Sequence, residues 1–334
     1  MARRDSIMIK PKDTRGTLVR VLAYFRDFIW VLAAVFILCI ISNVLALLGP
    51  SLAGKAINAA AAGPGKVDLA VVKYYAVRML ACYAASSLLA VLISVTMTTV
   101  AKRLMRKMRN DVFAKLTRLP VSFFDRNQAG DIISRVSYDI DVIGTSLAAD
   151  VTQILTSLVT VIGAFFMMIY ISLPLAAVVL FTIPVAVLYT SGMRKITQPR
   201  FVVRSKNYGI MNGFVEEMMS GQTTIQAYAY EGNVEEQFRE INKNAADGYY
   251  DAQYHAVTIG PTMGTINNIS LCIIAVLGSL LYMYERITLG DISSFVLYSR
   301  KFSGPINEIA NIINELFSAL AAAERVFGLL DEEE

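Results

Sequence analysis

The side chains with the clearest capacity for chemistry lie in one apolar segment near the C-terminus. Between Ile292 and Ser318, polar or small residues recur at steps of four and three, a spacing that places them on one face of a helix. Such side chains can hold a ligand through hydrogen bonds and charge, and we assign the chain no catalytic residue. The candidate binding face consists of Arg300, Gly304, Asn307, Asn311, Asn314 and Ser318, with a neighbouring stripe of Lys301 and Glu308 and with Asn267 and Asn268 as further candidates in the preceding apolar segment.

The candidate binding face begins at membrane depth. Arg300 and Lys301 follow the start of their segment by about eight residues, which is roughly 12 Å at the rise of an α-helix. Charged residues inside a membrane almost always face a bundle interior or a water-filled cavity. We therefore expect a ligand cavity here, with Phe295, Tyr298 and Phe302 as its apolar wall. The alternative is that the asparagines hold neighbouring helices together by hydrogen bonds.

Residues Gly49–Lys55 imitate a phosphate-binding loop, because they match the pattern GxxxxGK. The next residue is Ala56, so the hydroxyl that would bind magnesium is missing. An apolar run precedes the motif where a strand would be required. We interpret this stretch as a helix end with Gly-Pro punctuation, and not as a nucleotide site.

The cysteines and the single histidine do not form a metal or redox pattern. Cys39, Cys82 and Cys272 all lie in apolar runs and have no ligand-like spacing. We expect them to be buried as small hydrophobic residues. His255 alone cannot build a metal site, so we expect no metal.

Composition predicts an all-α membrane protein. The chain has 334 residues, of which 55% are hydrophobic, with a mean hydropathy of +0.50, against the ~45–50% apolar residues of ordinary soluble domains. A net charge of only +4 argues against a nucleic-acid partner.

The uncharged run 151–193 is too long for one span and is broken near Tyr170–Pro174. Six spans are expected at about 28–48, 71–100, 146–170, 174–193, 256–284 and 292–312, with long loops at 101–145 and 194–255.

The distribution of Lys and Arg predicts the topology. These residues number 7 in 1–27, 9 in 101–141 and 7 in 194–243, against 4 in 49–78 and 1 in 285–291. The positive-inside rule therefore places both termini and both long loops in the cytoplasm. Residues 1–27 are the N-terminal cytoplasmic segment. Its amphipathic end, about Thr17–Phe28, has Leu18, Leu22 and Phe25 on one face and predicts an elbow helix on the inner membrane surface.

Three motifs together resemble one family of transporters. Leu119–Gly144 contains SFFD followed by GDIISRVS; Glu216–Glu231 reads EEMMSGQTTIQAYAYE; Ala321–Asp331 reads AAAERVFGLLD. In this order and spacing they resemble the transmembrane domain of ABC exporters of the six-helix, domain-swapped type, in particular multidrug and lipid exporters. The resemblance implies a multi-pass protein of a bacterial inner or plasma membrane.

The resemblance also implies how the domain would work. Short coupling helices, here about Ser137–Ile143 and Ala227–Val234, would dock on nucleotide-binding domains. The domain would pair with a second transmembrane subunit, identical or different, whose fourth and fifth helices cross over, and would translocate amphipathic drugs, lipids or peptides. The residues assigned to the two coupling helices are Tyr138, Asp139, Ile140, Ala227, Tyr228 and Glu231.

The sequence contains no credible phosphate-binding loop or signature motif of an ATPase. We therefore expect ATP and magnesium to bind in a nucleotide-binding domain outside this sequence, and 321–334 to be a truncated linker toward it. Two alternatives remain open. One is a stand-alone or engineered ligand-binding scaffold without ATP-driven transport. The other is a passive channel, against which stands the lack of a repeated filter loop or a ring-forming charge pattern.

Overall fold

The computed structural model describes residues 14–61 and 67–334, which form helices and no strands. By Cα proximity the chain divides into two compact units. One, the hairpin unit, is 174–277. The other, the bundle unit, holds the described residues up to 173 and from 278 to 334. Within helices, the side chains outside this description are those of Leu147, Ile306, Asn307, Ile309, Ala310, Asn311 and Asn314.

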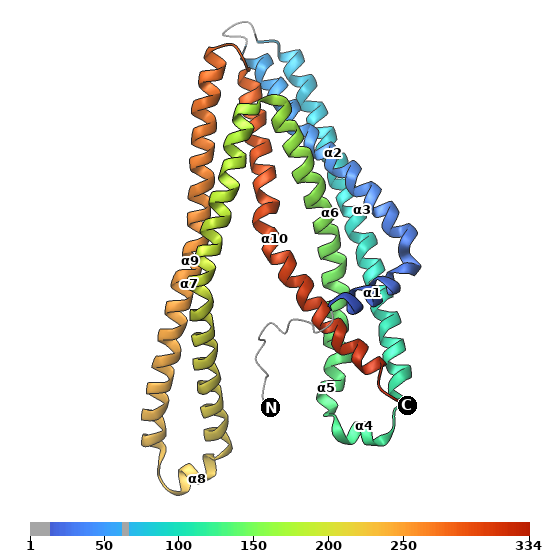
Figure 1. The fold of residues 1–334 in the computed structure, drawn as a ribbon, viewed down its shortest axis with the longest axis vertical. Coiled ribbons are helices and arrows are strands. Elements are labelled where there is room, and N and C mark those ends of the chain that lie inside the picture. The colour runs from blue at the N-terminus through green and yellow to red at the C-terminus, as the bar shows by residue number, and fades with distance from the viewer. Residues whose placement is uncertain (1–13, 62–66) are drawn as a thin grey trace. The chain divides into compact units, whose positions relative to one another are not determined.

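The bundle unit is built on three long helices and one that returns at the C-terminus (Figure 1). Short elements at the lower end in Figure 1 join α3 to α6, and α10 packs along α2 and α6. The elements are α1 (Thr14–Phe25), η1 (Arg26–Phe28), α2 (Ile29–Ala60), α3 (Leu69–Leu116), α4 (Val121–Arg126), α5 (Ala129–Ser134), the π-helical η2 (Arg135–Asp139), α6 (Ile140–Ile171) and α10 (Leu289–Leu330).

Local sequence signals set several helix ends. Asp68 caps α3, because its Oδ1 accepts a hydrogen bond from the Ala70 amide at 2.9 Å. Thr288 and Asp291 form a reciprocal capping box at the start of α10. Ser172 separates α6 from α7, within the break that Tyr170–Pro174 predicts.

The hairpin unit consists of two long antiparallel helices and a short one at their tip (Figure 1). They are α7 (Leu173–Ser220), α8 (Gln222–Ala227) and α9 (Glu231–Met283). The rings of Phe214 and Phe238 stack with centroids 6.4 Å apart, and the Asn207 amide donates to the Asn244 carbonyl at 2.8 Å. Closer to the apolar end, Thr182 donates to Ser270 at 3.0 Å.

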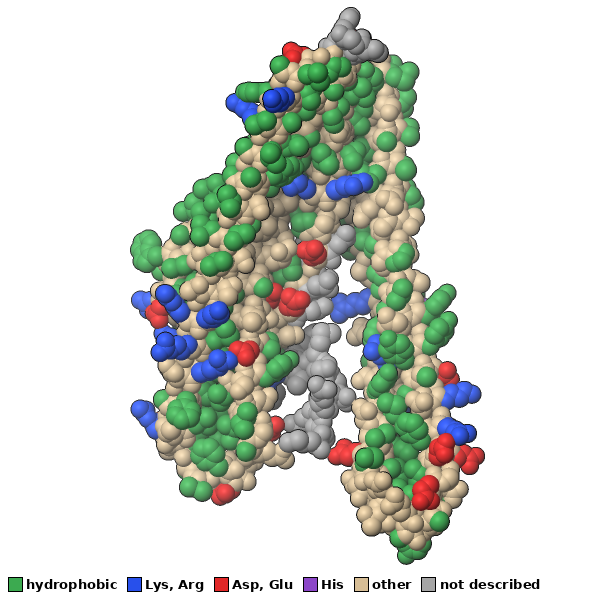
Figure 2. Space-filling view, turned by 180° about the vertical axis from the view of Figure 1, so that it is seen from behind, with side chains coloured by type: hydrophobic (Ala, Val, Ile, Leu, Met, Phe, Trp, Pro, Cys, Tyr) green, Lys and Arg blue, Asp and Glu red, His purple; other side chains and the backbone are tan. Residues whose placement is uncertain are grey.

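The helices confirm the prediction of an all-α, multi-pass membrane protein. Five helical stretches of the described chain are long and apolar enough to cross a membrane. The 42-residue α10, which carries the charges of the candidate binding face, is a sixth long helix, so the arrangement is consistent with the predicted six. Much of the segments 101–145 and 194–255 continues these helices. Figure 2 shows a broad apolar surface on the bundle unit, with Lys and Arg gathered below it.

The Gly-Pro segment of α2 is not a helix end, which corrects the sequence-based interpretation. The helix continues through Pro50 to Ala60. A Cβ atom on Gly54 would collide with Ser294 and with the Gly290 carbonyl oxygen, so glycine lets α2 and α10 approach closely. Ser294 donates to the Pro50 carbonyl at 2.8 Å across this contact.

The lower end of the bundle unit has its own hydrophobic core, here called the basal core. It joins α1, the lower half of α3, η2, the start of α6 and the end of α10. On α1 the buried face is Thr17, Val21 and Phe25, whereas Leu18 and Leu22 are exposed. The predicted single apolar face was therefore wrong: Phe25 faces the protein, whereas Leu18 and Leu22 face outward. Cys272 is likewise exposed rather than buried, while Cys39 is buried.

Candidate functional site

The described members of the candidate binding face lie away from the packed side of α10. Arg300, Gly304 and Glu308 are exposed in the bundle unit. Asn307, Asn311 and Asn314 lie on this helix, but their side chains are outside the described residues. On the opposite side, Phe295, Tyr298 and Phe302 are almost fully buried, and the Tyr298 hydroxyl donates to the Leu47 carbonyl at 2.6 Å. These aromatic rings therefore form the α10 packing surface and not the expected wall of a cavity.

Two charged groups of the same helix have partners on neighbouring helices. The Lys301 ammonium lies 5.9 Å from the ring centroid of Tyr83, where a cation–π contact offsets part of its desolvation. The Gln153 amide donates to Glu308 at 3.0 Å. Of the predicted face, Arg300, Gly304 and Ser318 are the described, exposed members on α10. Asn267 and Asn268 lie on α9 in the hairpin unit, half-buried and exposed respectively.

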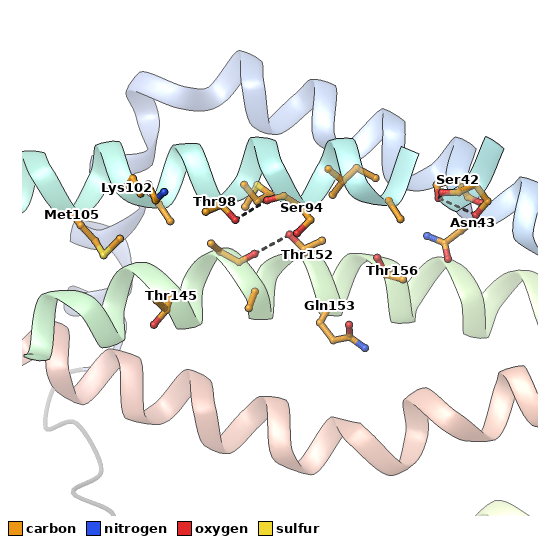
Figure 3. A pocket seen from close by; sticks show the side chains of 17 residues that line it. Ser42, Asn43, Ser94, Thr98, Lys102, Met105, Thr145, Thr152, Gln153 and Thr156 are labelled. Atoms are coloured by element: carbon orange, nitrogen blue, oxygen red, sulfur yellow. Dashed lines mark hydrogen bonds between the residues drawn. The ribbon is translucent and has the colours of Figure 1, made fainter. Parts of the chain in front are cut away.

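A cavity of about 570 Å³ lies elsewhere in the bundle unit, between α2, α3 and α6 (Figure 3). Its wall is apolar with interspersed hydroxyls, and Figure 3 shows Lys102 toward one end and Ser42 and Asn43 toward the other. The lining residues are Ser42, Asn43, Ser86, Ala90, Ile93, Ser94, Met97, Thr98, Ala101, Lys102, Met105, Thr145, Ala148, Ala149, Thr152, Gln153 and Thr156.

Three of these hydroxyls, on Thr98, Thr145 and Thr152, donate within their own helices, and Ser42 and Ser86 bond each other across α2 and α3. Thr98 donates to the Ser94 carbonyl and Thr152 to the Ala148 carbonyl, each at 2.8 Å. The cavity therefore offers a mainly apolar surface with a few polar groups and one cation, Lys102. Such a surface suits an amphipathic molecule or a packed helix. Sequence reasoning missed it, although Ser86, Ser94 and Thr98 recur at multiples of four along α3.

The tip of the first long loop is α4, which runs crosswise at the end of α3 in Figure 1. Its Val121 and Phe124 are exposed. Of the residues assigned to this coupling helix, Tyr138 is 66% exposed, but Asp139 and Ile140 are buried. The predicted segment 137–143 is thus the end of η2 and the start of α6. The crosswise helix, α4, precedes this segment in the chain.

The tip of the second long loop is α8, again a short helix between two long ones. Ala227 ends α8, and Tyr228 follows it with 80% of its surface exposed. Ala229 has a positive φ of 50°, which reverses the chain so that Glu231 can begin α9. The predicted segment 227–234 therefore straddles the turn, and the short helix precedes it.

Comparison with known families decides what these elements belong to. The family model described as the ABC transporter transmembrane region matches residues 32–306. The chain belongs to this family. The ABC transmembrane region thus accounts for the long helices, the two crosswise tips and the hairpin.

Individual relatives support the same assignment. An uncharacterized ABC transporter ATP-binding protein, YfiC, of Bacillus subtilis is 36% identical over 97% of this chain and 53% of its own length. A fatty acid ABC transporter ATP-binding/permease protein of Mycobacterium tuberculosis is 35% identical over 81% of this chain and 43% of its own length. A probable multidrug resistance ABC transporter ATP-binding/permease protein of B. subtilis is 28% identical over 70% of the chain and 35% of its own length. This chain spans about half the length of the first of these relatives.

The end of α10 is held in this ABC transmembrane region by two ion pairs. Arg325 contacts both oxygens of Asp139, at 2.9 and 2.6 Å, and Asp139 is only 3% exposed. The hydrogen bond with Asp139 raises the pKa of Arg325. Residues 321–330, predicted as linker, are helical, and Ala321–Ala323, Val326, Phe327 and Leu329 are buried.

The second ion pair joins α10 to α1. Arg20 Nη2 lies 2.8 Å from Asp331 Oδ1, and its guanidinium stacks 4.5 Å from the centroid of the Phe327 ring. The hydrogen bond from Arg20 holds the pKa of Asp331 below its usual value. Tyr24, which stacks on Phe327, donates to Asp111 at 2.9 Å. Burial, reinforced by this hydrogen bond, raises the pKa of Tyr24 to about 12.

Proposed function

We propose that this chain is the substrate-translocating membrane part of an ATP-driven exporter of amphipathic compounds. The observation that carries the proposal is the pair of crosswise helices, α4 and α8, each at the end of long helices that extend well beyond the expected spans. A short helix at the end of a rigid helix can transmit the motion of a docked partner. Its exposed apolar side chains, Phe124 and Tyr228 among them, supply the contact area that such a joint requires.

The partner docked there is a nucleotide-binding domain that supplies ATP and magnesium chemistry. Supporting this, relatives of greater length are named ATP-binding or ATP-binding/permease proteins. The Lys and Arg distribution supports a topology in which both tips and both termini lie in the cytoplasm. We propose a bacterial inner or plasma membrane as the location.

The chain works as a dimer with a second transmembrane subunit. In support, 174–277 forms a compact unit by itself, with large apolar side chains such as Phe181, Leu188 and Ile273 exposed along its apolar helices. Such faces need either lipid or protein against them. The domain-swapped family arrangement would place this hairpin unit against the second subunit.

The cargo is an amphipathic small molecule, lipid or peptide. Relatives are named for fatty acids and for multidrug resistance, which is in line with an apolar cargo carrying a polar group. On this chain, Arg300 and the cavity beside Lys102 provide cations within otherwise apolar surroundings. We propose that one or both contact the polar group of the cargo.

The test joins the chain to a nucleotide-binding domain and measures amphiphile-stimulated ATP hydrolysis. Phe124→Ala removes an exposed ring from α4 and Tyr228→Ala removes one from the residue that follows α8, and we expect stimulation to fall about tenfold while basal hydrolysis persists. Tyr170→Ala, an exposed ring at the other end of α6, is the matched control. Unchanged stimulation in both tip variants would contradict the coupling role. Ligand binding without any ATP response would favour the alternative, a binding scaffold.

A further inference from the structure

The cavity between α2, α3 and α6 has a charged end and an end whose amide is already bonded within the protein (Figure 3). Lys102 is the one charged side chain among the described residues that line it. At the opposite end, the Asn43 amide donates to the Cys39 carbonyl and its oxygen accepts from Thr160, each at 2.8 Å. A ligand therefore meets a charged donor at one end and a satisfied amide at the other.

Lys102 has no counter-ion within the part of the chain that the structure describes. It is exposed and forms no ion pair there, whereas Lys107 and Arg109 farther along α3 each hold an aspartate at 2.6 Å. Glu308 of α10 contacts the lining through Gln153, whose amide donates to it at 3.0 Å. The ammonium of Lys102 can therefore bind an anion from outside the chain through a charge-assisted hydrogen bond.

The wall between the two ends of the cavity is apolar. Ile93, Met97 and Ala101 of α3 and Ala148 of α6 line it, and these four residues are buried members of one hydrophobic cluster. A hydrocarbon chain packs against such side chains and requires no hydrogen bond from them. The lining thus combines one cationic end with an apolar interior.

The position of the cavity matches the inner leaflet of a membrane. Lys102 lies just beyond the expected span 71–100, and Thr145 lies just before the expected span 146–170. From Lys102 to Ser86 the wall follows α3 for roughly 24 Å at the rise of an α-helix. One leaflet of hydrocarbon is about 15 Å thick, half of the bilayer core. A head group at Lys102 would therefore lie at the membrane boundary, with room for an acyl chain toward the membrane centre.

We propose that this cavity binds a single-chain anionic amphiphile, of the class of long-chain carboxylates, with its head group at Lys102 and its chain against Ile93 and Met97. The volume of about 570 Å³ suits one such chain. Lys102 repels a cationic amphiphile, and a neutral one leaves its charge without a partner. The inference rests on the proposed function for the statement that this amphiphile is a cargo, whereas its binding concerns the bundle unit alone.

The first test locates the ligand on the whole chain in nanodiscs of neutral phosphatidylcholine, without ATP. The probe is hexadecanoate with a photoreactive diazirine in the middle of its chain, and mass spectrometry identifies the crosslinked peptides. We expect labelling of the lining segments of α3 and α6, around Met97 and Thr152. Labelling confined to other segments would overturn the proposal, and that is the result expected if a helix of a second copy fills the cavity.

Competition against this probe tests the charge of the ligand. Unlabelled hexadecanoate should displace the probe, and hexadecanol and hexadecyltrimethylammonium should be about tenfold weaker competitors. Phosphatidylglycerol carries an anionic head group on two chains and should also be about tenfold weaker, because the cavity holds one chain. Equal competition by the neutral or cationic compound would overturn the anionic class, and equal competition by phosphatidylglycerol would overturn the single chain.

Substitution of Lys102 tests the residue that carries the proposal. In Lys102→Gln, affinity for hexadecanoate should fall about tenfold while affinity for hexadecanol stays unchanged, and Lys102→Arg should retain the wild-type preference. Arg103→Gln is the matched control, because it removes an exposed cation from the next position, outside the lining. An equal loss in Lys102→Gln and Arg103→Gln would show general attraction to a basic surface and overturn the site.

A steric variant tests the cavity independently of charge. Ala149 lines the cavity from an exposed position of α6, so Ala149→Phe should place a ring in the cavity and abolish probe labelling there. Ala84→Phe, at an exposed alanine of α3 outside the lining, is the control and should label normally. Full labelling of the lining segments in Ala149→Phe would overturn the proposed position of the chain.

The same ligand separates this inference from the proposed function. In the chain joined to a nucleotide-binding domain, hexadecanoate should stimulate ATP hydrolysis, and Lys102→Gln should weaken that stimulation. Binding that depends on Lys102 but gives no stimulation supports the site and counts against transport. Stimulation by other amphiphiles, together with hexadecanoate binding that does not depend on Lys102, overturns the site and leaves the proposed function standing.

Discussion

Two ion pairs hold the end of α10, and they differ in how much water reaches them. Asp139 of η2 is 3% exposed and is bound by Arg325 of α10, whose side chain is 43% exposed. Asp331 follows α10 and is bound by Arg20 of α1, and these two side chains are 59% and 43% exposed. The buried carboxylate therefore depends on its arginine for compensation, whereas water can replace the partner of the exposed one.

The comparison shows that the burial of the carboxylate decides how much an ion pair with arginine contributes. At the basal core, the buried pair locks the end of α10 to η2. The exposed pair adds a second, weaker contact between the end of α10 and α1.

The largest effect is expected from Arg325→Ala, which leaves Asp139 buried without its counter-charge. Because the Arg325 side chain is 43% exposed, water can partly replace it. We therefore expect a loss of about 2–3 kcal/mol in unfolding free energy, below the 3–5 kcal/mol typical of fully buried pairs. Denaturant unfolding in detergent measures it. A loss no greater than that of Arg103→Ala, an exposed arginine of α3, would show that the pair does not lock α10.

A smaller loss, about 1 kcal/mol, is expected from Asp139→Asn. The amide oxygen still accepts one hydrogen bond from Arg325, and water can solvate the half-exposed guanidinium. Comparing this variant with Arg325→Ala by the same denaturant unfolding tests the asymmetry. Equal losses in the two would mean that the uncompensated charge is not what makes Asp139 sensitive.

The smallest effect is expected from Arg20→Ala, because the pair with Asp331 is exposed on both sides. We expect a loss of about 0.5–1 kcal/mol at pH 7, including the stacking on Phe327. The pKa of Asp331 is lowered in the folded protein, so its contribution is complete above the unfolded value of 3.8 and is lost as pH falls through the lower folded value.

Melting curves of wild type and Arg20→Ala should therefore converge as the pH falls toward 3. A difference between the two proteins that grows on acidification would contradict the role given to Asp331.

Local patterns were sufficient for much of the architecture. Long uncharged runs predicted the membrane helices, because hydrocarbon excludes charge regardless of how the helices pack. Tyr170–Pro174 predicted the break at Ser172, since Pro fits the first turn of a new helix, where its missing N–H costs no hydrogen bond. The motif around Gly130 and Asp131 indicated the family, which the match over residues 32–306 confirms.

Tertiary structure alone decided which faces meet. Periodicity placed Arg300 and Glu308 on one side of a helix, but it could not reveal that Glu308 accepts from Gln153, 155 positions away. Nor could it show that Asp139 pairs with Arg325, 186 positions away, or that a cavity opens between α2, α3 and α6. A helical pattern records only neighbours within a few turns, whereas these contacts depend on how distant segments pack. That is why the sequence determined the helices and the family, and the folded chain determined which carboxyl group receives an arginine.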